Sequence, residues 1–306
     1  MPDEHRDALE LDRLTKAGTE KSLDRAIVVT GASTGIGRAI VAKAVREGSH
    51  VFASVRGQTD ANALLQDFGQ SVTPLVFDVT DESGVRSGAK QVRQMLGQRR
   101  LFGLINNAGI AVSGPLLHIS TEELQRQFDV NMLGVHRVTT AFAPLLGVDP
   151  DRIGKLGRIV MISSEGGQRG MPFVGPYSAS KFALEGYSQS LRRELMLYDI
   201  DVIVVGPGAI ATPIWDKALK NDLSRVGQTN YGPSAQKVSD YMVQQGRDGL
   251  PANMVADRVW QALTAKNPKT RYSILRNALV DRTLANLLPP RVVDSIVAQR
   301  LGFSKR

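Results

Sequence analysis

The segment Ala26-Ile27-Val28-Val29-Thr30-Gly31-Ala32-Ser33-Thr34-Gly35-Ile36-Gly37 joins a short apolar run to a glycine-rich turn. Four consecutive apolar residues before the turn are typical of a strand that is buried on both faces, as in a parallel sheet. After the turn, apolar residues recur at helical spacing and predict a helix over residues 36–47. Glycines between a buried strand and a helix N-terminus allow a tight turn to which a phosphate group can come close.

The alternation of strand and helix continues along the chain. Further strands are expected at residues 50–55, 72–77, 101–106, 157–162, 201–205 and 271–275, and further helices at 60–68, 81–96, 121–145 and 177–198. Such alternation implies parallel strands joined by right-handed crossovers. We therefore expect one doubly wound, Rossmann-like α/β domain, with a parallel sheet of about seven strands and helices on both faces.

A second informative stretch is Tyr177-Ser178-Ala179-Ser180-Lys181. A tyrosine and a lysine four residues apart lie on one face of a helix, so the phenol and the ammonium project side by side. A neighbouring cation favours the ionised phenol and lowers its pKa from about 10 toward neutral pH, where a phenol can act as a general acid or base. Taken alone, the pair fits an ordinary amphipathic helix equally well.

Two other stretches accompany this pair. Asn106-Asn107-Ala108-Gly109 ends one expected strand, and Ser163-Ser164 follows another, thirteen residues before the tyrosine. Together with the glycine-rich turn and the tyrosine–lysine pair, in this order, they resemble the short-chain dehydrogenase/reductase family over residues 24–275. Residues 172–176 and the long C-terminus are similar to the hydroxysteroid and retinol dehydrogenase branch of that family.

The resemblance implies an enzyme that interconverts a ketone or aldehyde and an alcohol by hydride transfer. In this interpretation Tyr177 exchanges a proton with the substrate oxygen, Lys181 lowers the pKa of Tyr177 and binds the cofactor ribose, and Ser164 hydrogen-bonds the substrate oxygen. Asn131 orders a water molecule that links Lys181 to bulk solvent; the alternative, a structural amide that hydrogen-bonds backbone, is compatible with this role. Ser163 is not expected to take part, because its side chain points away from that of Ser164.

The resemblance also places cofactor-binding residues at the ends of five strands and on the tyrosine helix. They are Gly31, Ser33, Thr34, Gly35, Ile36, Gly37, Arg56, Asp78, Val79, Asn107, Ala108, Gly109, Tyr177, Lys181, Pro207, Gly208, Ile210 and Thr212. In the family, the last two of these positions meet the nicotinamide end of the cofactor. Asp78 is expected to contact the adenine; capping of the helix from Thr80 onward is the other role open to it, and the two roles are compatible.

The end of the second strand predicts which nicotinamide cofactor is preferred. A carboxylate there selects NAD through the ribose 2′-hydroxyl, whereas an arginine binds the 2′-phosphate of NADP. Val55 takes the acidic position and Arg56 follows it, so NADP(H) is the expected cofactor and NAD(H) the second possibility. Ser33 could add a hydroxyl to the phosphate site. Against this, Thr34 stands where many NADP-preferring relatives have a basic residue, and Arg56 could instead face solvent.

Three segments lie outside the strand–helix alternation. Residues 1–24 are expected to be an N-terminal extension of the dinucleotide-binding domain, which spans residues 25–281. Residues 213–256 are an insertion, and in the family this region forms the substrate lid. A segment on the surface with two helices and no lid function would have the same composition. Residues 282–306 predict a C-terminal helical extension that packs on the domain, joins a dimer interface or makes weak peripheral contact with a membrane.

The lid has few charges, which favours a bulky hydrophobic ketone or alcohol resembling a steroid or a retinoid. Two alternatives stay open. A 3-oxoacyl thioester reductase is disfavoured because such relatives end soon after the last strand. A dinucleotide-binding redox sensor without turnover is disfavoured because such relatives lose the tyrosine or the lysine, which this chain keeps. The family resemblance also implies a homodimer or a homotetramer.

Composition argues against several other classes of protein. The 306 residues include no cysteine, which excludes disulfides and thiolate nucleophiles, and the four histidines lack ligand spacing, so no metal site is expected. The net charge of +8 is spread along the chain, so no nucleic-acid partner is expected. No apolar run approaches the ~18–20 residues that span a bilayer, and the N-terminus is too polar for a signal peptide, so a cytoplasmic location is expected.

Overall fold

The computed structural model describes residues 22–212, 224–276 and 288–303. Within them, seven parallel strands form one sheet in the order β3-β2-β1-β4-β5-β6-β7. The strands are β1 (Ile27–Val29), β2 (Val51–Val55), β3 (Val72–Val76), β4 (Gly103–Asn106), β5 (Arg158–Ile162), β6 (Val202–Pro207) and β7 (Arg271–Ile274). Strand order reverses between β1 and β4, which opens a crevice at their carboxyl ends. The expected doubly wound α/β fold is confirmed.

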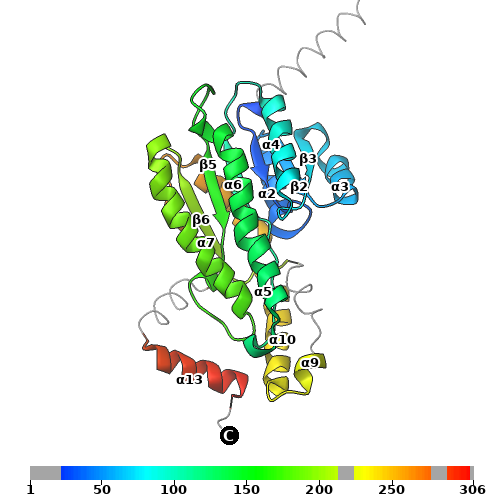
Figure 1. Cartoon of the computed structure of the whole chain (residues 1–306), viewed down its shortest axis with the longest axis vertical. Helices are drawn as coiled ribbons and strands as arrows, with labels where there is room; N and C mark the ends of the chain where they lie inside the picture. The colour runs from blue at the N-terminus through cyan, green and yellow to red at the C-terminus, as the bar shows by residue number, and fades with distance from the viewer. Residues whose placement is uncertain (1–21, 213–223, 277–287, 304–306) are drawn as a thin grey trace, which may run out of the picture.

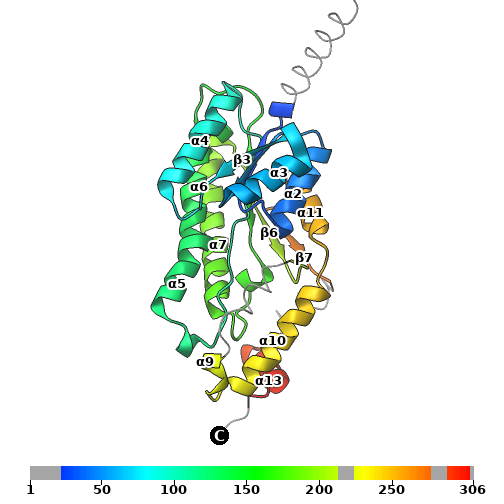
Figure 2. The ribbon, with the colours of Figure 1, turned by 90° about the vertical axis from the view of Figure 1, so that its right-hand side faces the viewer.

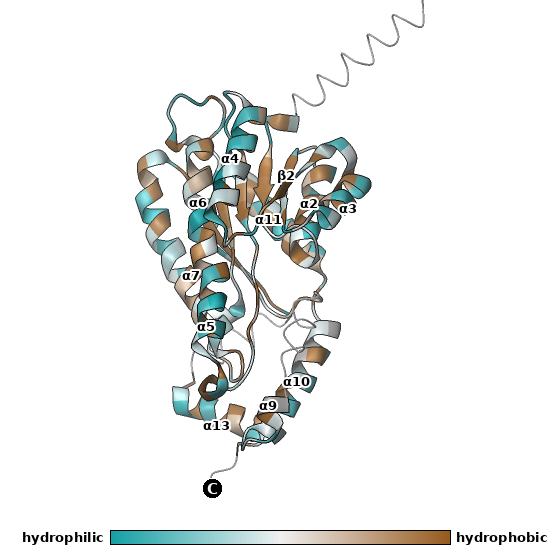
Figure 3. Cartoon of the chain, turned by 45° about the vertical axis from the view of Figure 1, so that its right-hand side comes forward, coloured by the Kyte–Doolittle hydropathy of each residue, from teal (hydrophilic) through white to brown (hydrophobic). Residues whose placement is uncertain are grey.

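Helices cover both faces of the sheet (Figures 1 and 2). One layer consists of α2 (Gly35–Arg46), α3 (Gln58–Phe68) and α11 (Ala252–Thr264), and the other of α4 (Glu82–Leu96), α5 (Thr121–Phe128), α6 (Gly134–Ala143) and α7 (Gly175–Glu194). Because successive side chains of a strand point to opposite faces, Ile27 and Val29 join the first apolar cluster and Val28 joins the second. Figure 3 shows the apolar residues gathered on the strands between these layers.

The long helix expected over residues 121–145 is interrupted. α5 begins with a capping box, in which Ser120 Oγ accepts from the Glu123 N–H and the Glu123 carboxylate accepts from the Ser120 N–H. A π-helical turn, η3 (Asp129–Leu133), separates α5 from α6, and a second one, η4 (Pro144–Val148), follows α6. Single π-helical turns often mark functional sites, and η3 carries the fully buried Asn131.

The helix that carries the tyrosine–lysine pair begins just before the pair. α7 begins at Gly175, so Tyr177 and Lys181 are both helical, and it is followed by the 3-10 turn η6 (Leu195–Tyr198). Phe173, immediately before α7, has a φ of 64° and is buried. The remaining 3-10 turns are η1 (Gly69–Ser71), η2 (Leu116–His118) and η5 (Glu165–Gly167).

Among the described residues, three helices lie beyond the carboxyl ends of the strands: α9 (Ser224–Gly227), α10 (Gly232–Arg247) and α13 (Pro290–Leu301) (Figures 1 and 2). They meet the loop before α7 in a small apolar cluster, where the ring of Phe173 contacts the rings of Tyr231 and Phe303, each at 6.0 Å between centroids. Expectations for residues 1–21, 213–223, 277–287 and 304–306 lie outside the described residues. Within the described ranges, no helix is both long enough and apolar enough to cross a membrane.

Candidate active site

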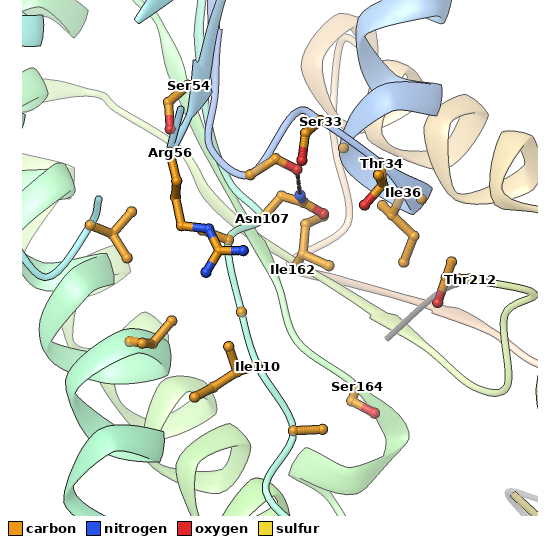
Figure 4. Close-up of a pocket in the computed structure, with 18 of the residues that line it drawn as sticks. Ser33, Thr34, Ile36, Ser54, Arg56, Asn107, Ile110, Ile162, Ser164 and Thr212 are labelled. Atoms are coloured by element: carbon orange, nitrogen blue, oxygen red, sulfur yellow. Dashed lines mark hydrogen bonds between the residues drawn. The ribbon is translucent and has the colours of Figure 1, made fainter. Parts of the chain in front are cut away.

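A cavity of about 690 Å³ lies at the carboxyl ends of the strands (Figure 4). This volume is within the range of small-molecule and cofactor sites. The glycine-rich turn after β1, the ends of β2 to β6 and the first turns of α7 line the cavity. All the predicted catalytic and cofactor-binding residues line it except Asn131, so positions more than 180 residues apart in the chain meet at one site.

The glycine-rich turn leaves room for a ligand because its glycines have no side chains to cover the backbone. Gly31 has a φ of 63°, and a Cβ there would lie 2.9 Å from Ala108 Cα. A Cβ on Gly37 would clash with the Gly31 carbonyl oxygen and lie 2.6 Å from Asn107 Nδ2. Thr34, the N-cap residue of α2, makes no side-chain hydrogen bond to the first helical turn. The N–H groups of that turn can therefore bind an anion, which fits the pyrophosphate of a dinucleotide.

The ends of β1 and β4 are held together by side chains. Thr30 Oγ1 accepts hydrogen bonds from the N–H groups of Asn107 and Ala108, at 2.9 and 3.0 Å. In return, Asn107 Nδ2 donates to the carbonyl oxygens of Thr30 and Gly31, at 2.9 and 3.1 Å. Thr30 is almost completely buried and is not among the predicted site residues. The sequence feature that could have identified Thr30 is its position as the polar residue that ends an apolar run.

Ser164 and Tyr177 both line the cavity, and Figure 4 shows the Ser164 side chain projecting from the loop after β5. Ser164 Oγ accepts a hydrogen bond from the Gly166 N–H at 3.0 Å, and the Ser164 side chain also hydrogen-bonds Tyr177. Ser163 also lines the cavity, but its buried Oγ faces Gly167, so that a Cβ on Gly167 would lie 2.8 Å from it. Ser164 is therefore the serine whose side chain hydrogen-bonds Tyr177.

Lys181 is buried beneath Tyr177. Its Nζ donates to the Ile162 carbonyl oxygen at 2.8 Å and lies 5.8 Å from the centroid of the Tyr177 ring. Burial lowers the pKa of Lys181 to about 8, against the opposing effect of the Glu185 carboxylate. Burial also raises the pKa of Tyr177, and the hydrogen bond with Ser164 offsets part of this. The expected lowering of the Tyr177 pKa by Lys181 is thus not found, because burial of the phenol has the larger effect.

Asn131 lies behind the cavity wall and binds backbone. Its Oδ1 accepts from the Ile110 N–H at 2.9 Å, and its Nδ2 donates to the Ile110 carbonyl oxygen at 3.0 Å and to Ser180 Oγ at 3.1 Å. One turn earlier, the buried Gln127 donates to the same Ile110 carbonyl and accepts from the Val112 N–H at 2.7 Å. Ser180 and Gln127 were not predicted, although the i, i+4 spacing of two amides is visible in the sequence.

Two arginines from different layers reach the cavity. Arg56 extends from the end of β2 into it (Figure 4), is exposed, and forms no ion pair with any residue in the described ranges. Arg126 of α5 also lines the cavity and was not predicted, because a single exposed arginine on a helix has no distinctive pattern. The nearby Asp129 is paired with Arg137 at 2.8 Å. Two guanidinium groups are therefore available to an anionic ligand.

Asp78 does not cap the helix that follows it. The α4 N-cap residue is Asp81, whose carboxylate accepts from the Ser83 N–H at 3.0 Å. Asp78 instead accepts from the N–H and hydroxyl of Thr80, at 2.9 and 2.8 Å, and lines the cavity together with Val79. The helix-cap alternative for Asp78 is therefore wrong.

Comparison with known proteins agrees with this geometry. The family model for short chain dehydrogenases matches residues 25–223. The NADPH-dependent 3-dehydrocapnine reductase of Ornithobacterium rhinotracheale is 37% identical over 272 residues, covering 89% of this chain and 95% of that protein. Retinol dehydrogenase 5 of Mus musculus is 33% identical over 291 residues, covering 90% and 88%.

A solved structure is also similar over most of its length. The crystal structure of a short-chain dehydrogenase from Streptomyces avermitilis matches with a TM-score of 0.70 and 26% identity, covering 90% of this chain and 95% of that one. The resemblance in the sequence to the family and to its retinol dehydrogenase branch is confirmed. The chain belongs to the short-chain dehydrogenase family of oxidoreductases, which act on alcohols and carbonyls.

Proposed function

We propose that the protein is an NADP(H)-dependent oxidoreductase that interconverts a ketone or aldehyde and an alcohol, with Tyr177 as general acid and base. The observation that carries the proposal is that Ser164, Tyr177 and Lys181 line the same cavity as the glycine-rich turn. The bare backbone of that turn, which a Cβ would fill, fits a dinucleotide. When bound, the nicotinamide cofactor supplies or accepts the hydride, and the protein supplies binding, orientation and the proton.

Several groups of the chain would hold the cofactor. The first turn of α2 and the turn glycines bind the pyrophosphate, and Arg56 binds the 2′-phosphate of the adenosine ribose. Asp78, Val79 and residues of the segment 207–212 line the cavity, where the first two would hold the adenine and the segment after β6 would hold the nicotinamide. Lys181 binds the ribose next to the nicotinamide. The relative named as NADPH-dependent supports the choice of cofactor.

In the direction of reduction, Tyr177 Oη donates its proton to the substrate oxygen and Ser164 Oγ hydrogen-bonds the same atom. Two donors directed at one oxygen stabilise the negative charge that develops there. The raised pKa of Tyr177 keeps the phenol protonated at neutral pH, ready to donate. Lys181, with a pKa of about 8, remains largely protonated at pH 7 and stabilises the phenolate that Tyr177 becomes. The water-ordering role of Asn131 stays a prediction, since its amide is already bonded to Ile110 and Ser180.

Replacing Arg56 with alanine is expected to weaken NADPH binding by roughly 10- to 100-fold, because hydrogen bonds to charged groups contribute about 1.5–3 kcal/mol. The affinity for NADH should be nearly unchanged, because NADH has no 2′-phosphate. Fluorescence titration of the wild type and the variant with both nucleotides measures the ratio. Arg86→Ala on α4 is the control, because Arg86 is exposed and does not line the cavity. An unchanged ratio in Arg56→Ala would remove the basis for NADP selectivity.

A bulky hydrophobic substrate, similar to a steroid or a retinoid, is the second part of the proposal. The half-buried Tyr177 packs against an apolar cluster formed by Phe173, Val174, Val226, Ala235 and Val238, from α9, α10 and the loop before α7. The similarity to a retinol dehydrogenase supports the same class of substrate. We further propose that residues 213–256 form the lid of a domain spanning residues 25–281.

Turnover with a panel of carbonyl compounds tests the function. Purified protein is titrated with NADPH and NADH, and then assayed with steroid, retinoid, small aromatic and 3-oxoacyl thioester substrates. Tight NADPH binding with reduction of a bulky ketone or aldehyde is the expected result. Reduction of the thioester alone would favour the 3-oxoacyl reductase, and binding without any turnover would favour a redox sensor. Failure to bind either nucleotide would contradict the proposal.

Association into a homodimer or homotetramer is also proposed. Leu124 of α5, Leu133 of η3 and Phe182 of α7 are large apolar side chains that are 37–48% exposed, and they supply surface for a second copy. Peripheral contact with a membrane through residues 282–306 stays a prediction. Val292 and Ile296 of α13 are exposed apolar side chains that could make it.

A further inference from the structure

A nearly buried ion pair lies directly behind the cavity wall. Arg271 Nε, at the start of β7, lies 3.2 Å from Glu185 Oε1 of α7, and the two side chains are 15% and 11% exposed. Arg271 Nη2 donates to the Ser164 carbonyl oxygen at 3.4 Å, and Nη1 donates to Ser273 Oγ. One guanidinium therefore connects β7, α7 and the serine that follows β5.

Glu185 belongs to the same helix face as the site residues. Tyr177, Lys181 and Glu185 follow one another at intervals of four residues, so they lie along one side of α7. The turn η5 packs closely on this side: a Cβ on Gly167 would lie 3.0 Å from the Lys181 carbonyl oxygen and 3.1 Å from Glu185 Cγ. Because Gly167 has no side chain, the Glu185 side chain lies directly against the turn η5, whose N-cap residue is Ser164.

Arg271 has little freedom to move away. Its guanidinium lies against β6, where a Cβ on Gly206 would be 2.7 Å from Arg271 Cζ. Three of its nitrogens are engaged, by Glu185, Ser273 and the Ser164 carbonyl. A planar guanidinium that makes several hydrogen bonds at once fixes orientation as well as distance. A shift of Arg271 would therefore be transmitted to the backbone of Ser164.

The charges around Lys181 are few. β6 contains no ionisable residue, and β5 contains only Arg158, which is paired with Asp201 at the opposite end of the strand. The ionisable groups on the elements that surround Lys181 include Tyr177 and Glu185 of α7, Arg271 of β7, Glu165 of η5, Asp129 of η3 and Arg126 of α5. The other ionisable residues of the same elements are Tyr187, Arg192, Arg193 and Glu194 of α7, Glu122 and Glu123 of α5, and Tyr272 of β7. Among them, the Glu185 carboxylate is the group that favours the charged form of Lys181, against its burial.

We propose that Glu185 and Arg271 are positioning residues for the reaction: Glu185 supplies the fixed negative charge that balances the Lys181 ammonium, and Arg271 holds the Ser164 backbone. The inference rests on the proposed function, because it concerns the same site. Stability alone is a weak explanation of the pair, since well-packed apolar residues often replace a buried ion pair without loss.

Glu185→Gln is the first test, because the amide keeps the shape of the side chain and an oxygen for Arg271 while removing the charge. The pKa of Lys181 is measured by competitive labelling with acetic anhydride at a series of pH values, followed by mass spectrometry of the Lys181 peptide. We expect the Lys181 pKa, about 8 in the wild type, to fall in Glu185→Gln. Glu185→Asp, which keeps the charge, should restore the wild-type titration.

Activity supplies the second readout. Glu185→Gln should lower kcat at pH 8 by roughly 5- to 20-fold, within the range of coupling in an ion-pair network, and move the alkaline limb of the kcat–pH profile to lower pH. NADPH affinity and KM should change little. Arg271→Lys keeps the positive charge but loses the planar guanidinium with its several hydrogen-bond donors. It should therefore lower kcat while leaving the Lys181 pKa unchanged. The double variant Glu185→Gln/Arg271→Met removes two opposite charges that lie 3.2 Å apart, so its Lys181 titration should return toward that of the wild type while kcat stays low.

An unchanged Lys181 titration in folded Glu185→Gln would overturn the role of Glu185, and wild-type kcat in folded Arg271→Lys would overturn the role of Arg271. The labelling experiment needs no substrate, which separates this inference from the proposed function. If the wild type reduces no carbonyl while the Lys181 titration shifts, the proposed function fails and the electrostatic role of Glu185 stands. If the wild type turns over and the titration does not shift, only the inference fails.

Discussion

Replacing Tyr177 with phenylalanine is expected to lower kcat by about 10²- to 10⁴-fold, the usual contribution of a positioned general acid or base. The variant lacks the hydroxyl that would donate the proton, and the hydrogen bond to Ser164 is lost with it. The ring still packs against the same apolar cluster, so the fold and the binding of NADPH should be retained. Turnover, NADPH titration and thermal unfolding of the variant provide the three measurements.

Tyr187→Phe is the matched control for this experiment. Tyr187 also lies on α7, and its hydroxyl also has a partner, His136 Nδ1 at 3.1 Å, but it does not line the cavity. Removing that hydroxyl should leave kcat within about twofold of the wild type, as expected for a substitution outside the site. If Tyr177→Phe turned over as fast as Tyr187→Phe, Tyr177 could not be the acid and base of the reaction.

Gly37→Ala is expected to weaken the binding of both NADPH and NADH by at least about 10- to 100-fold, because overpacking typically costs about 1–3 kcal/mol and here the obstacle is backbone. The added methyl would clash with the Gly31 carbonyl oxygen and lie 2.6 Å from Asn107 Nδ2. Relief requires the turn itself to move, and the turn forms the phosphate-binding part of the proposed site. Fluorescence titration with both nucleotides measures the loss.

A helical glycine with free space around it controls for the effect of alanine itself. A Cβ on Gly186 of α7 would meet nothing within 4 Å, so Gly186→Ala should bind both nucleotides as the wild type does. Thermal unfolding of both variants shows how much of the Gly37→Ala effect is loss of fold. Wild-type nucleotide affinity in Gly37→Ala would mean that the cofactor does not bind at this turn.

Much of the architecture could be predicted because its determinants are local. Strands buried on both faces are continuous apolar runs, such as Ile27–Val29, and the helices between them repeat their apolar residues at helical spacing. The interruption at η3 could not be predicted, because it serves contacts made by Asn131 with Ile110 and Ser180 on two other segments. The spacing of apolar residues alone predicts a continuous helix through such a turn.

The residues of the site also divide into those that the sequence could predict and those that it could not. Motifs with fixed spacing identified Ser164, Tyr177 and Lys181, because each belongs to a short pattern with a chemical reason behind it. Arg126 and Gln127 were missed, because each reaches the site or its wall only through the packing of α5 against the sheet ends. Their residue types are common on helix surfaces and carry no signal of their own.

The sequence by itself determined the fold, the family and the residue types that meet at the cavity, because the alternation of strands and helices and the spaced motifs depend on near neighbours in the chain. Tertiary structure decided the direction in which the pKa of Tyr177 shifts, since burial depends on every element packed around the phenol. It also decided the pairing of Glu185 with Arg271, which are 86 residues apart. Charge and dielectric environment are properties of the assembled molecule, so no local pattern could supply them.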